Sequence, residues 1–484
     1  MMRPQVTNDL RSQAASLLAA APCSIEMPAG TGKTHLLATA AAVAAEAGSR
    51  SLVLTHTHAG VDAIRRRLRR FGVPAGMVRV DTLASWAFTL SRSYSFIAGV
   101  QISKMPDWTQ SRDYLDGASR VVRAKAIADM HSTSFDYLFV DEYQDCSIAY
   151  HDFVRALAET IPRTIVLGDR LQGIFTFDGP TVHWDHHVLV NFPRHEVPVH
   201  PHRWTDHNVD LGAWLLETRA LLATGSWFDF AEHDVPGLQF VPEVGAAVLA
   251  RVSHGFRDFN ESVVLLDKWS GDVAGHASRL GGSYTVMEDI GGRFMKEKLE
   301  GVPEQGDPGL ARWFADFAKS CVIGLSGLDG PVLGKLERRE SVAHYKRDGL
   351  EEVLVALDTL QVNPTYEQVA VTARIVRDTP GLRLYRWEAW NDTREALLSA
   401  VETGESVLDS LARVRDRVRR AGRRSENRVA SRTLLVKGLE YDHVVIADLS
   451  KMTDPCNLYV AMSRARKTVT VLGPGSRIFL RAGS

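Results

Sequence analysis

The sequence predicts an α/β protein built on parallel sheets, and three observations support this class. Short apolar runs recur along the chain, and several of them end at polar or acidic residues. A glycine-containing loop, residues 28–34, leads from one such run into an alanine-rich segment that predicts a helix. A second run, residues 137–140, ends at the acid pair Asp141 and Glu142. Because ligands of open α/β sheets bind beyond the carboxyl ends of the strands, these two stretches mark the expected site.

Length and composition set the outer limits of the prediction. The 484 residues, 45% of them hydrophobic and 24% charged, allow two to four domains with ample cores. The net charge of −1 gives no overall attraction to nucleic acid, so such binding would need local basic patches. Four scattered cysteines without ligand spacing argue against zinc or iron–sulfur sites and favour a reducing cytoplasm. No apolar run approaches the length of a membrane span, so we expect a cytoplasmic protein without a membrane partner.

The loop at residues 28–34 has the composition of a phosphate-binding loop. Gly30 and Gly32 allow the backbone N–H groups to close on an anion, and Lys33 can reach the β- and γ-phosphates. Thr34 offers a hydroxyl to Mg²⁺, and the following helix presents its positive end to the phosphates. The strict pattern has glycine where this chain has Met27.

The acid pair after residues 137–140 complements this loop. Asp141 suits a Mg²⁺ ligand, and Glu142 suits a group that polarises water. Taken alone, the pair could equally be a solvated acidic turn. The loop and the acid pair together, in this order, predict binding and hydrolysis of a nucleoside triphosphate.

The elements of the first half follow one order. A helix is expected over residues 7–18, where Gln13 either contacts adenine or lies on the surface. Strands are expected at residues 51–55, 77–80 and 164–168, and residues 88–133 carry no strand signal and predict a short helical insert. Gln172 follows the last of these strands. This order predicts a RecA-like lobe over residues 1–190.

The second half predicts another lobe that a helical domain interrupts. The lobe takes in residues 191–295 and 426–484, and residues 296–425 carry the amphipathic pattern of a helical accessory domain. Strands are expected at residues 262–266, 444–447 and 468–472, and a helix is expected to carry residues 459–466.

Two kinds of residue cluster are candidates for further sites. The histidines between His183 and His207 fall across several expected elements without acidic partners at fixed spacing, so no metal site is predicted there. Residues 64–70 and 413–428 are rich in arginine, with eight arginines in the second stretch. Each stretch is either a patch for nucleic acid or a solvated helix face.

Four motifs appear in a fixed order after the phosphate loop. They are Asp-Glu-x-Gln-Asp at 141–145, Gly-Asp-x-x-Gln-x-Ile-Phe at 168–175, Lys-Gly-Leu-Glu-Tyr at 437–441 and Tyr-Val-Ala-x-Ser-Arg-Ala at 459–465. With these motifs the chain resembles the UvrD/Rep group of superfamily 1 DNA helicases over nearly its whole length. The resemblance implies two RecA-like lobes that hydrolyse ATP between them.

The resemblance also implies a role for each matching residue. In the nucleotide site, the resemblance implies that Gln13 contacts adenine, that Glu440 contacts the ribose, and that the phosphates are held by Ala29, Gly30, Thr31, Gly32, Lys33 and Thr34. Thr34 and Asp141 hold Mg²⁺, Glu142 activates water, and Gln172 senses the γ-phosphate. Arg203 and Arg464 act as arginine fingers from the second lobe. On the DNA path, the implied contacts are Thr55, His56, Thr82, Phe175 and Phe177.

The chain departs from that group at three places. Phe177 replaces the tryptophan that stacks on bases, although a phenyl ring can still stack. Leu434 and Leu435 replace the usual His-Ser before the Lys-Gly-Leu-Glu motif, which removes one expected DNA contact. The insert between Thr82 and Asp141 is short, as in the GajB-type helicase subunits of Gabija anti-phage systems.

The resulting prediction is an ATP-dependent translocase or helicase on single-stranded or forked DNA, moving 3′ to 5′ by family resemblance, with ATP and Mg²⁺. Its trimmed form implies a nuclease partner subunit in an anti-phage or repair complex, against the alternative of a self-sufficient small helicase. A different class of function stays open, namely an ATP-gated regulatory subunit that senses nucleic acid without processive unwinding.

Overall fold

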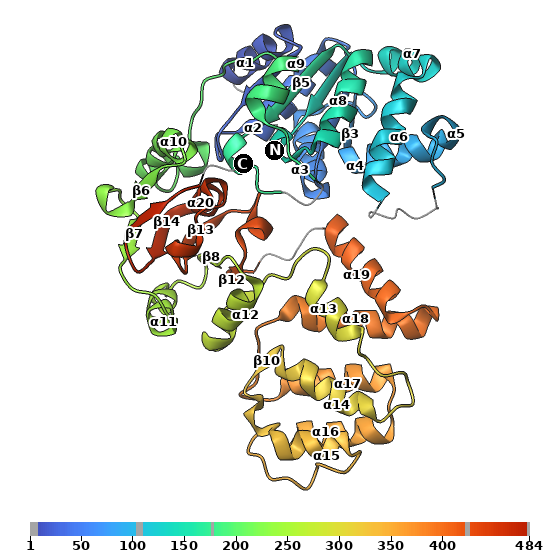
Figure 1. Ribbon diagram of the computed structural model, residues 1–484, viewed down its shortest axis with the longest axis vertical. Coiled ribbons are helices and arrows are strands. Elements are labelled where there is room, and N and C mark those ends of the chain that lie inside the picture. The colour runs from blue at the N-terminus through green and yellow to red at the C-terminus, as the bar shows by residue number, and fades with distance from the viewer. Residues whose placement is uncertain (1–7, 103–109, 176–178, 422–425, 482–484) are drawn as a thin grey trace. The chain divides into compact units, whose positions relative to one another are not determined.

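The computed structural model describes residues 8–102, 110–175, 179–421 and 426–481, and it contains two parallel sheets, one of five and one of six strands (Figure 1). The predicted α/β class is therefore confirmed. The chain divides into two compact units, which are unit 1 (1–228, 454–463 and 479–484) and unit 2 (229–453 and 464–478). Residues 191–228 and 454–463, which the sequence assigned to the second lobe, lie in unit 1. The domain boundaries from the sequence stay a prediction.

Unit 1 is built on the five-stranded sheet, in the order β1-β5-β4-β2-β3. Its strands are β1 (Cys23–Glu26), β2 (Ser51–Thr55), β3 (Val78–Thr82), β4 (Tyr137–Val140) and β5 (Arg163–Gly168). Every neighbouring pair is parallel. All five carboxyl ends therefore meet at one edge, where the loops that follow them can form a site.

Helices cover both faces of this sheet because successive strand residues point to opposite sides. Val53 and Phe139 pack with α1, α2 and α3, whereas Leu52 and Leu138 pack with α4, α6 and α8. The helices of unit 1 are α1 (Asn8–Ala19), α2 (Lys33–Glu46), α3 (His58–Phe71), α4 (Leu83–Ser93), α5 (Ser95–Ala98), α6 (Ser111–Arg123), α7 (Lys125–Ser134), α8 (Ile148–Thr160), α9 (Leu189–Asn191), α10 (Val209–Ala223) and α20 (Pro455–Met462). Within the described part of residues 88–133 the secondary structure is helical, as expected.

Unit 2 contains the six-stranded sheet, in the order β7-β14-β13-β8-β12-β9. Its strands are β7 (Leu238–Val241), β8 (Val263–Leu266), β9 (Thr285–Val286), β12 (Arg428–Ser431), β13 (Tyr441–Ile446) and β14 (Ala465–Leu472). Helices α11 (Ala246–Gly255) and α12 (Ser270–Arg279) pack against one face through Val263, Leu265 and Val445. The short strands β6 (Trp227–Asp229) and β15 (Arg477–Phe479) pair separately.

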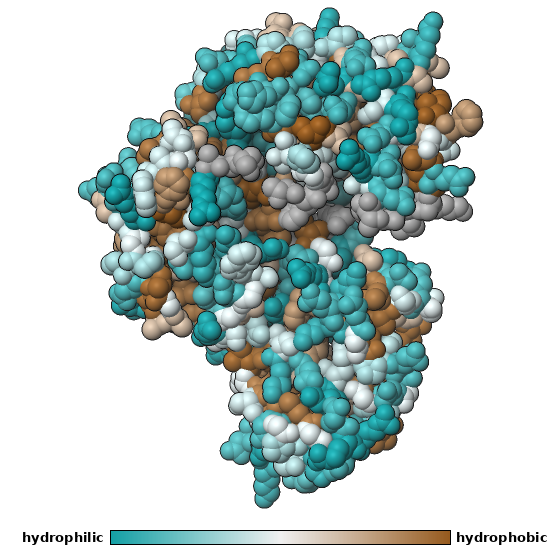
Figure 2. Space-filling view, viewed as in Figure 1, coloured by the Kyte–Doolittle hydropathy of each residue, from teal (hydrophilic) through white to brown (hydrophobic). Residues whose placement is uncertain are grey.

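Between β9 and β12 the chain forms a helical region with its own hydrophobic core. Its helices are α13 (Arg293–Leu299), α14 (Gly309–Lys319), α15 (Gly330–Glu337), α16 (Glu351–Val362), α17 (Tyr366–Asp378), α18 (Trp387–Thr403) and α19 (Val407–Ala421). Phe314, Phe317 and Trp390 lie at the centre of the core, while hydrophilic residues cover most of the face of this region seen in Figure 2. A two-stranded antiparallel sheet of β10 (Val322–Ile323) and β11 (Arg383–Leu384) was not expected from the sequence.

One expected element was wrong in its extent. The predicted helix over residues 459–466 ends at Met462, and the chain enters strand β14 at Ala465. The physical reason lies in the sheet of unit 2, where the N–H of Tyr441 donates to the carbonyl of Arg464 at 2.9 Å and Tyr441 is the register partner of Ala465. Pairing with a neighbouring strand decides the conformation there, and local helix propensity does not.

Among the described residues, no helix combines the length and apolar character needed to cross a lipid bilayer.

Candidate active site

The phosphate loop connects β1 to α2 at the carboxyl edge of the first sheet. Gly30 and Gly32 have φ values of 73° and 92°, in the left-handed region that side chains rarely adopt. A Cβ at Gly30 would also lie 2.7 Å from the ring of Trp204, so this position needs glycine for space as well. The Thr31 hydroxyl donates to the carbonyl of Pro28 at 2.7 Å and braces the turn.

Met27, the departure from the strict loop pattern, has a packing role. Its N–H donates to the carbonyl of Gly168 at 2.9 Å, which continues the pairing of β1 with β5, and its side chain is buried. The loop thus begins one residue after the methionine and still presents its two left-handed glycines.

The acid pair lies directly opposite the start of α2. Lys33 Nζ is 2.9 Å from Glu142 Oε1 and 3.7 Å from Asp141 Oδ1. The Thr34 hydroxyl donates to Asp141 Oδ2 at 3.4 Å. These contacts arise because β1 and β4 both neighbour β5, so their carboxyl ends lie close together. The structure therefore brings together four of the residues that the sequence singled out.

Burial and neighbouring charges shift the pKa values of Lys33 and Asp141 in opposite directions. Burial lowers the pKa of Lys33, but the carboxylates of Glu142 and Asp141 outweigh burial and raise it above its ordinary value. Burial raises the pKa of Asp141 to about 6, and the neighbouring Lys33 ammonium opposes that rise. A buried carboxylate with 2% exposure beside a hydroxyl offers the hard oxygen ligands that Mg²⁺ prefers.

The residues present fit a Mg²⁺ ion that shares its shell with a substrate. In the described part of the chain, no three or more His, Cys, Asp or Glu side chains are arranged to hold a metal by themselves. Thr34 and Asp141 would supply two oxygens, and phosphate oxygens and waters would complete the shell.

Glu142 adopts a strained backbone conformation. With φ 57° and ψ 40° it is left-handed, which among the described non-glycine residues occurs only here and at Arg339. Its N–H donates to Asp141 Oδ1 at 2.9 Å, which ties the turn to the Asp141 carboxylate. Strain of this kind persists where the surroundings fix it, and it is common at functional sites.

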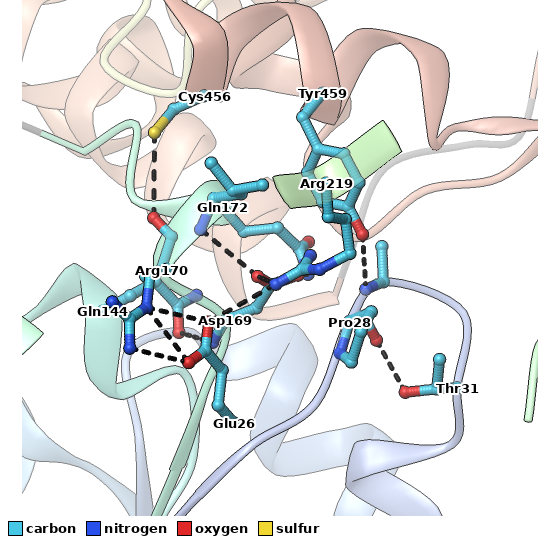
Figure 3. Close-up of polar contacts among 12 residues, drawn as sticks. Glu26, Pro28, Thr31, Gln144, Asp169, Arg170, Gln172, Arg219, Cys456 and Tyr459 are labelled. Carbon is cyan, nitrogen blue, oxygen red and sulfur yellow. Dashed lines mark hydrogen bonds and ion pairs between the residues drawn. The ribbon is translucent and has the colours of Figure 1, made fainter. Parts of the chain in front are cut away.

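Gln172 is connected to Glu142 of the acid pair by hydrogen bonds through Asp169 and Gln144, and Figure 3 draws the contacts among Gln172, Asp169 and Gln144. Its Nε2 donates to Asp169 Oδ2 at 2.9 Å, and the N–H of Asp169 donates to Gln144 Oε1 at 2.9 Å. Gln144 Nε2 in turn donates to Glu142 Oε2 at 2.5 Å. The loop after β5 and the acid pair after β4 therefore form one network.

Arg203 lies beside the phosphate loop in unit 1. Its N–H donates to the carbonyl of Gly30 at 3.0 Å, and its guanidinium donates to the carbonyl of Ser463. The N–H of Ala29 donates to the hydroxyl of Tyr459 at 3.1 Å. Helix α20 and the segment before α10 thus both contact the loop.

The other nucleotide-site candidates are spread over both units. Gln13 is half-buried in α1, and its Nε2 donates to Asp9 Oδ2 at 3.0 Å. Arg464 belongs to unit 2, is 1% exposed and donates to the carbonyl of Leu439 at 3.4 Å. Glu440, also in unit 2, is exposed. Their assigned contacts with adenine, phosphate and ribose stay predictions.

The DNA candidates begin at the same edge of the first sheet. Thr55 and Thr82 are register partners at the ends of β2 and β3. The Thr82 hydroxyl accepts from the N–H of Ser85 at 3.0 Å and so caps α4. His56 Nε2 lies 3.3 Å from Cys146 Sγ, and Phe175 is half-buried after the loop that carries Gln172. Phe177 lies outside the described residues.

Part of the arginine-rich stretch 413–428 has a structural role. Arg415 is buried, donates to Asp392 Oδ2 at 2.5 Å and donates to the carbonyl of Asp289 at 2.7 Å, so it is a cation of the helical core. Arg428 donates to the carbonyl of Phe256 at 2.7 Å. Arg415 therefore belongs neither to a patch for nucleic acid nor to a solvated helix face. The side chains of Arg419, Arg420, Arg423 and Arg424 lie outside the described part.

Two residues of the site had no signal in the sequence. Arg219 in α10 contacts Asp169, and Trp204 covers Gly30, but neither lies in a recognisable pattern of spacing. Arg219 is revealed only by its ion pair with Asp169, and Trp204 only by its close approach to Gly30.

Comparison with known proteins agrees with the loop geometry. The sequence profile of the AAA domain family matches residues 11–178, which contain the phosphate loop, the acid pair and Gln172. No curated protein matches this sequence. Among solved structures, the crystal structure of the Pif1 helicase from Candida albicans is similar, with 11% sequence identity, a TM-score of 0.37, and coverage of 98% of this chain and 95% of that chain. The profile match and the left-handed glycines together identify a P-loop nucleoside-triphosphate-binding domain in residues 11–178.

Proposed function

We propose that this chain is an ATP-hydrolysing motor that moves along single-stranded DNA. One observation carries the ATPase part, which is the convergence of Lys33, Thr34, Asp141 and Glu142 at the end of the glycine loop. A cation for the phosphates, oxygen ligands for a metal and a carboxylate for water activation then lie within one side-chain length of each other.

The chemistry assigns one task to each group. The loop N–H groups and Lys33 bind the phosphates, and Thr34 and Asp141 hold Mg²⁺, which when bound neutralises charge on the phosphate oxygens. Lys33 is paired with Glu142 at 2.9 Å. An arriving phosphate competes for the Lys33 ammonium, so the Glu142 carboxylate can turn to a water and accept its proton.

The remaining assignments extend this proposal. Gln172 responds to the γ-phosphate, Arg203 and Arg464 stabilise the charge of the transferring phosphoryl group, Gln13 contacts adenine and Glu440 the ribose. DNA passes along the carboxyl edge that carries Thr55, His56, Thr82 and Phe175, because these positions follow strands of the same sheet as the phosphate loop. The 3′ to 5′ polarity rests on the UvrD/Rep resemblance alone.

We further propose that the chain works with a nuclease partner, in an anti-phage or repair complex. The support is the short insert between Thr82 and Asp141, which leaves little surface for holding a DNA fork.

Steady-state ATP hydrolysis with single-stranded DNA of increasing length tests the motor. We expect turnover to rise with strand length, because a translocating motor hydrolyses more ATP per encounter on a longer track. Stimulation that is independent of length would contradict translocation and support the ATP-gated regulatory subunit. Absence of turnover with any DNA would contradict both.

A further inference from the structure

An arginine outside every sequence motif, Arg219, whose side chain is only 14% exposed, holds the carboxylate of Asp169 beside Gln172. Asp169 has no exposed surface and caps the start of the 3₁₀ turn that follows β5. Arg219 Nη2 lies 2.7 Å from Asp169 Oδ1, and Nη1 donates to Asp169 Oδ2 at 3.0 Å (Figure 3). Such a two-point, charge-assisted contact fixes the orientation of the carboxylate as well as its charge.

The same guanidinium contacts the phosphate-loop side of the site. It lies 4.9 Å from the ring centroid of Tyr459, whose hydroxyl accepts from the N–H of Ala29 at 3.1 Å. Burial raises the pKa of Tyr459 to about 12, so the hydroxyl stays neutral. Burial lowers the pKa of Arg219, but Asp169 outweighs burial and raises it above the ordinary value, so the guanidinium stays charged.

Asp169 connects Arg219 to the groups that are expected to act on the γ-phosphate. Its carboxylate accepts from Gln172 Nε2 at 2.9 Å, and its N–H donates to Gln144 Oε1 at 2.9 Å. Gln144 donates to Glu142 at 2.5 Å. A continuous path of contacts therefore runs from the N–H of Ala29 through Arg219 to the carboxylate of Glu142.

We propose that Arg219 is a positioning residue for ATP hydrolysis, which acts through Asp169 on Gln172 and Glu142 and through Tyr459 on the phosphate loop. The inference rests on the proposed ATPase function. If Arg219 is lost, the buried Asp169 carboxylate loses the cation that is paired with it, so Asp169 must move or take up a proton, and Gln144 and Gln172 move with it. Lysine keeps the charge but cannot replace the planar two-point contact.

The test compares Arg219→Lys with the matched control Arg170→Lys. Arg219 Nη2 lies 3.4 Å from Glu26 Oε1, and Arg170 pairs with the same carboxylate at 3.0 Å. Arg170 differs in that it contacts Asp185 in place of Asp169, and its side chain is 35% exposed. We expect Arg219→Lys to lower kcat for DNA-stimulated ATP hydrolysis by about tenfold to 100-fold, the usual result of a small misplacement. The KM for ATP and the affinity for a fluorescent ADP analogue should stay within about threefold of wild type. Arg170→Lys should change kcat by less than about twofold, as expected for a partly exposed ion pair.

A double-mutant cycle tests the route through Asp169. Arg219→Met and Asp169→Asn each leave one buried charge, whereas the double variant removes both, so we expect its kcat loss to be smaller than the product of the single losses. Arg219→Lys keeps a positive charge beside Asp169, so it keeps the inference falsifiable if Arg219→Met fails to fold. A kcat within about twofold of wild type for Arg219→Lys, equal losses of kcat and nucleotide affinity, or an additive cycle would each overturn the inference. Absence of turnover in the wild-type chain would contradict the proposed function instead.

Discussion

At the scale of single residues, the site is organised by charges that have been removed from water. Lys33 and Asp141 are 7% and 2% exposed, and the Lys33 ammonium compensates the carboxylates of both Asp141 and Glu142. Removing one partner of such a group leaves an uncompensated buried charge, so substitutions that change shape least are the most informative.

Lys33→Ala and Glu142→Gln should separate binding from hydrolysis. Lys33→Ala removes the cation that meets the phosphates, so both ATP affinity and turnover should fall. Glu142→Gln keeps the shape and removes only the proton acceptor, so kcat should fall by roughly 10²-fold to 10⁴-fold while affinity stays near wild type. Titration with a fluorescent nucleotide beside a turnover assay measures both quantities. Equal losses of affinity in the two variants would contradict the assignments.

Arg464→Ala tests the arginine finger, with Arg466→Ala as its matched control. Arg466 pairs with Asp442 at 3.0 Å on the neighbouring strand, so its loss should affect hydrolysis little. If Arg464 reaches the transferring phosphoryl group, its loss should lower kcat by about 10³-fold to 10⁵-fold with nearly normal ATP binding. Hydrolysis within about threefold of wild type in Arg464→Ala would remove the finger role and make Arg466 the candidate.

At the scale of elements, side-chain polar contacts hold helices against the segments that carry candidate residues. Thr82 caps α4, and His151 in α8 packs on the turn that follows β4, where the Tyr143 hydroxyl lies 2.7 Å from its Nδ1. Each segment that carries a candidate residue is thus held by a neighbouring polar contact. A substitution at such a contact can therefore be tested for its effect on stability and on function.

Thr82→Ala should cost about 1 kcal/mol of stability, because the N–H groups at the start of α4 lose their acceptor. Thr82→Ser keeps the hydroxyl and should retain the stability. Thermal unfolding measures the change in stability, and binding of single-stranded DNA measures the proposed DNA contact of Thr82. A Thr82→Ala variant that melts like wild type would show that the cap is not needed.

Stability should fall with acid through His151. Burial lowers the pKa of His151 to about 4, below the value of about 6.5 in an unfolded chain. Between these two values the unfolded chain binds a proton that the folded chain does not, so the melting temperature should fall as the pH drops from 6.5 to 4. His151→Gln should show a smaller fall over this range than wild type. An identical pH profile in the two proteins would mean that His151 does not carry the effect.

At the scale of the whole molecule, motor activity depends on surfaces that hold the fork as well as on ATP turnover. The helices that the structure describes between Thr82 and Asp141 are α4 to α7, which form a short insert. Opening each base-pair step costs about 1.4 kcal/mol of stacking on average, so a motor that lacks fork-holding surfaces unwinds poorly.

The purified chain alone should therefore unwind short forked duplexes weakly and long ones hardly at all. A fluorescent fork assay with duplexes of two lengths, run at low and moderate salt, measures this. DNA binding should weaken as salt rises, because phosphate contacts release counterions. Processive unwinding of long duplexes without any added protein would contradict the partner hypothesis and support a self-sufficient helicase.

The sequence by itself determined the parts of this protein that depend on local pattern. Short apolar runs predicted the central strands, and the spacing of Gly30, Gly32 and Lys33 predicted the phosphate loop, because backbone conformation and residue type are local properties. The parallel arrangement then implied that Asp141 and Glu142 would lie near Lys33, and the structure has them 2.9–3.7 Å from its ammonium.

Only the tertiary structure decided the contacts between distant segments. It ended the helix at Met462 through strand pairing, placed Arg415 in a helical core, and put Arg219 on Asp169. These outcomes depend on which buried charge or backbone group lies opposite, and residues more than twenty positions apart leave no periodic signal of such a contact. The nucleotide-binding loop could therefore be predicted from the sequence, whereas the residues that hold it in place follow from packing.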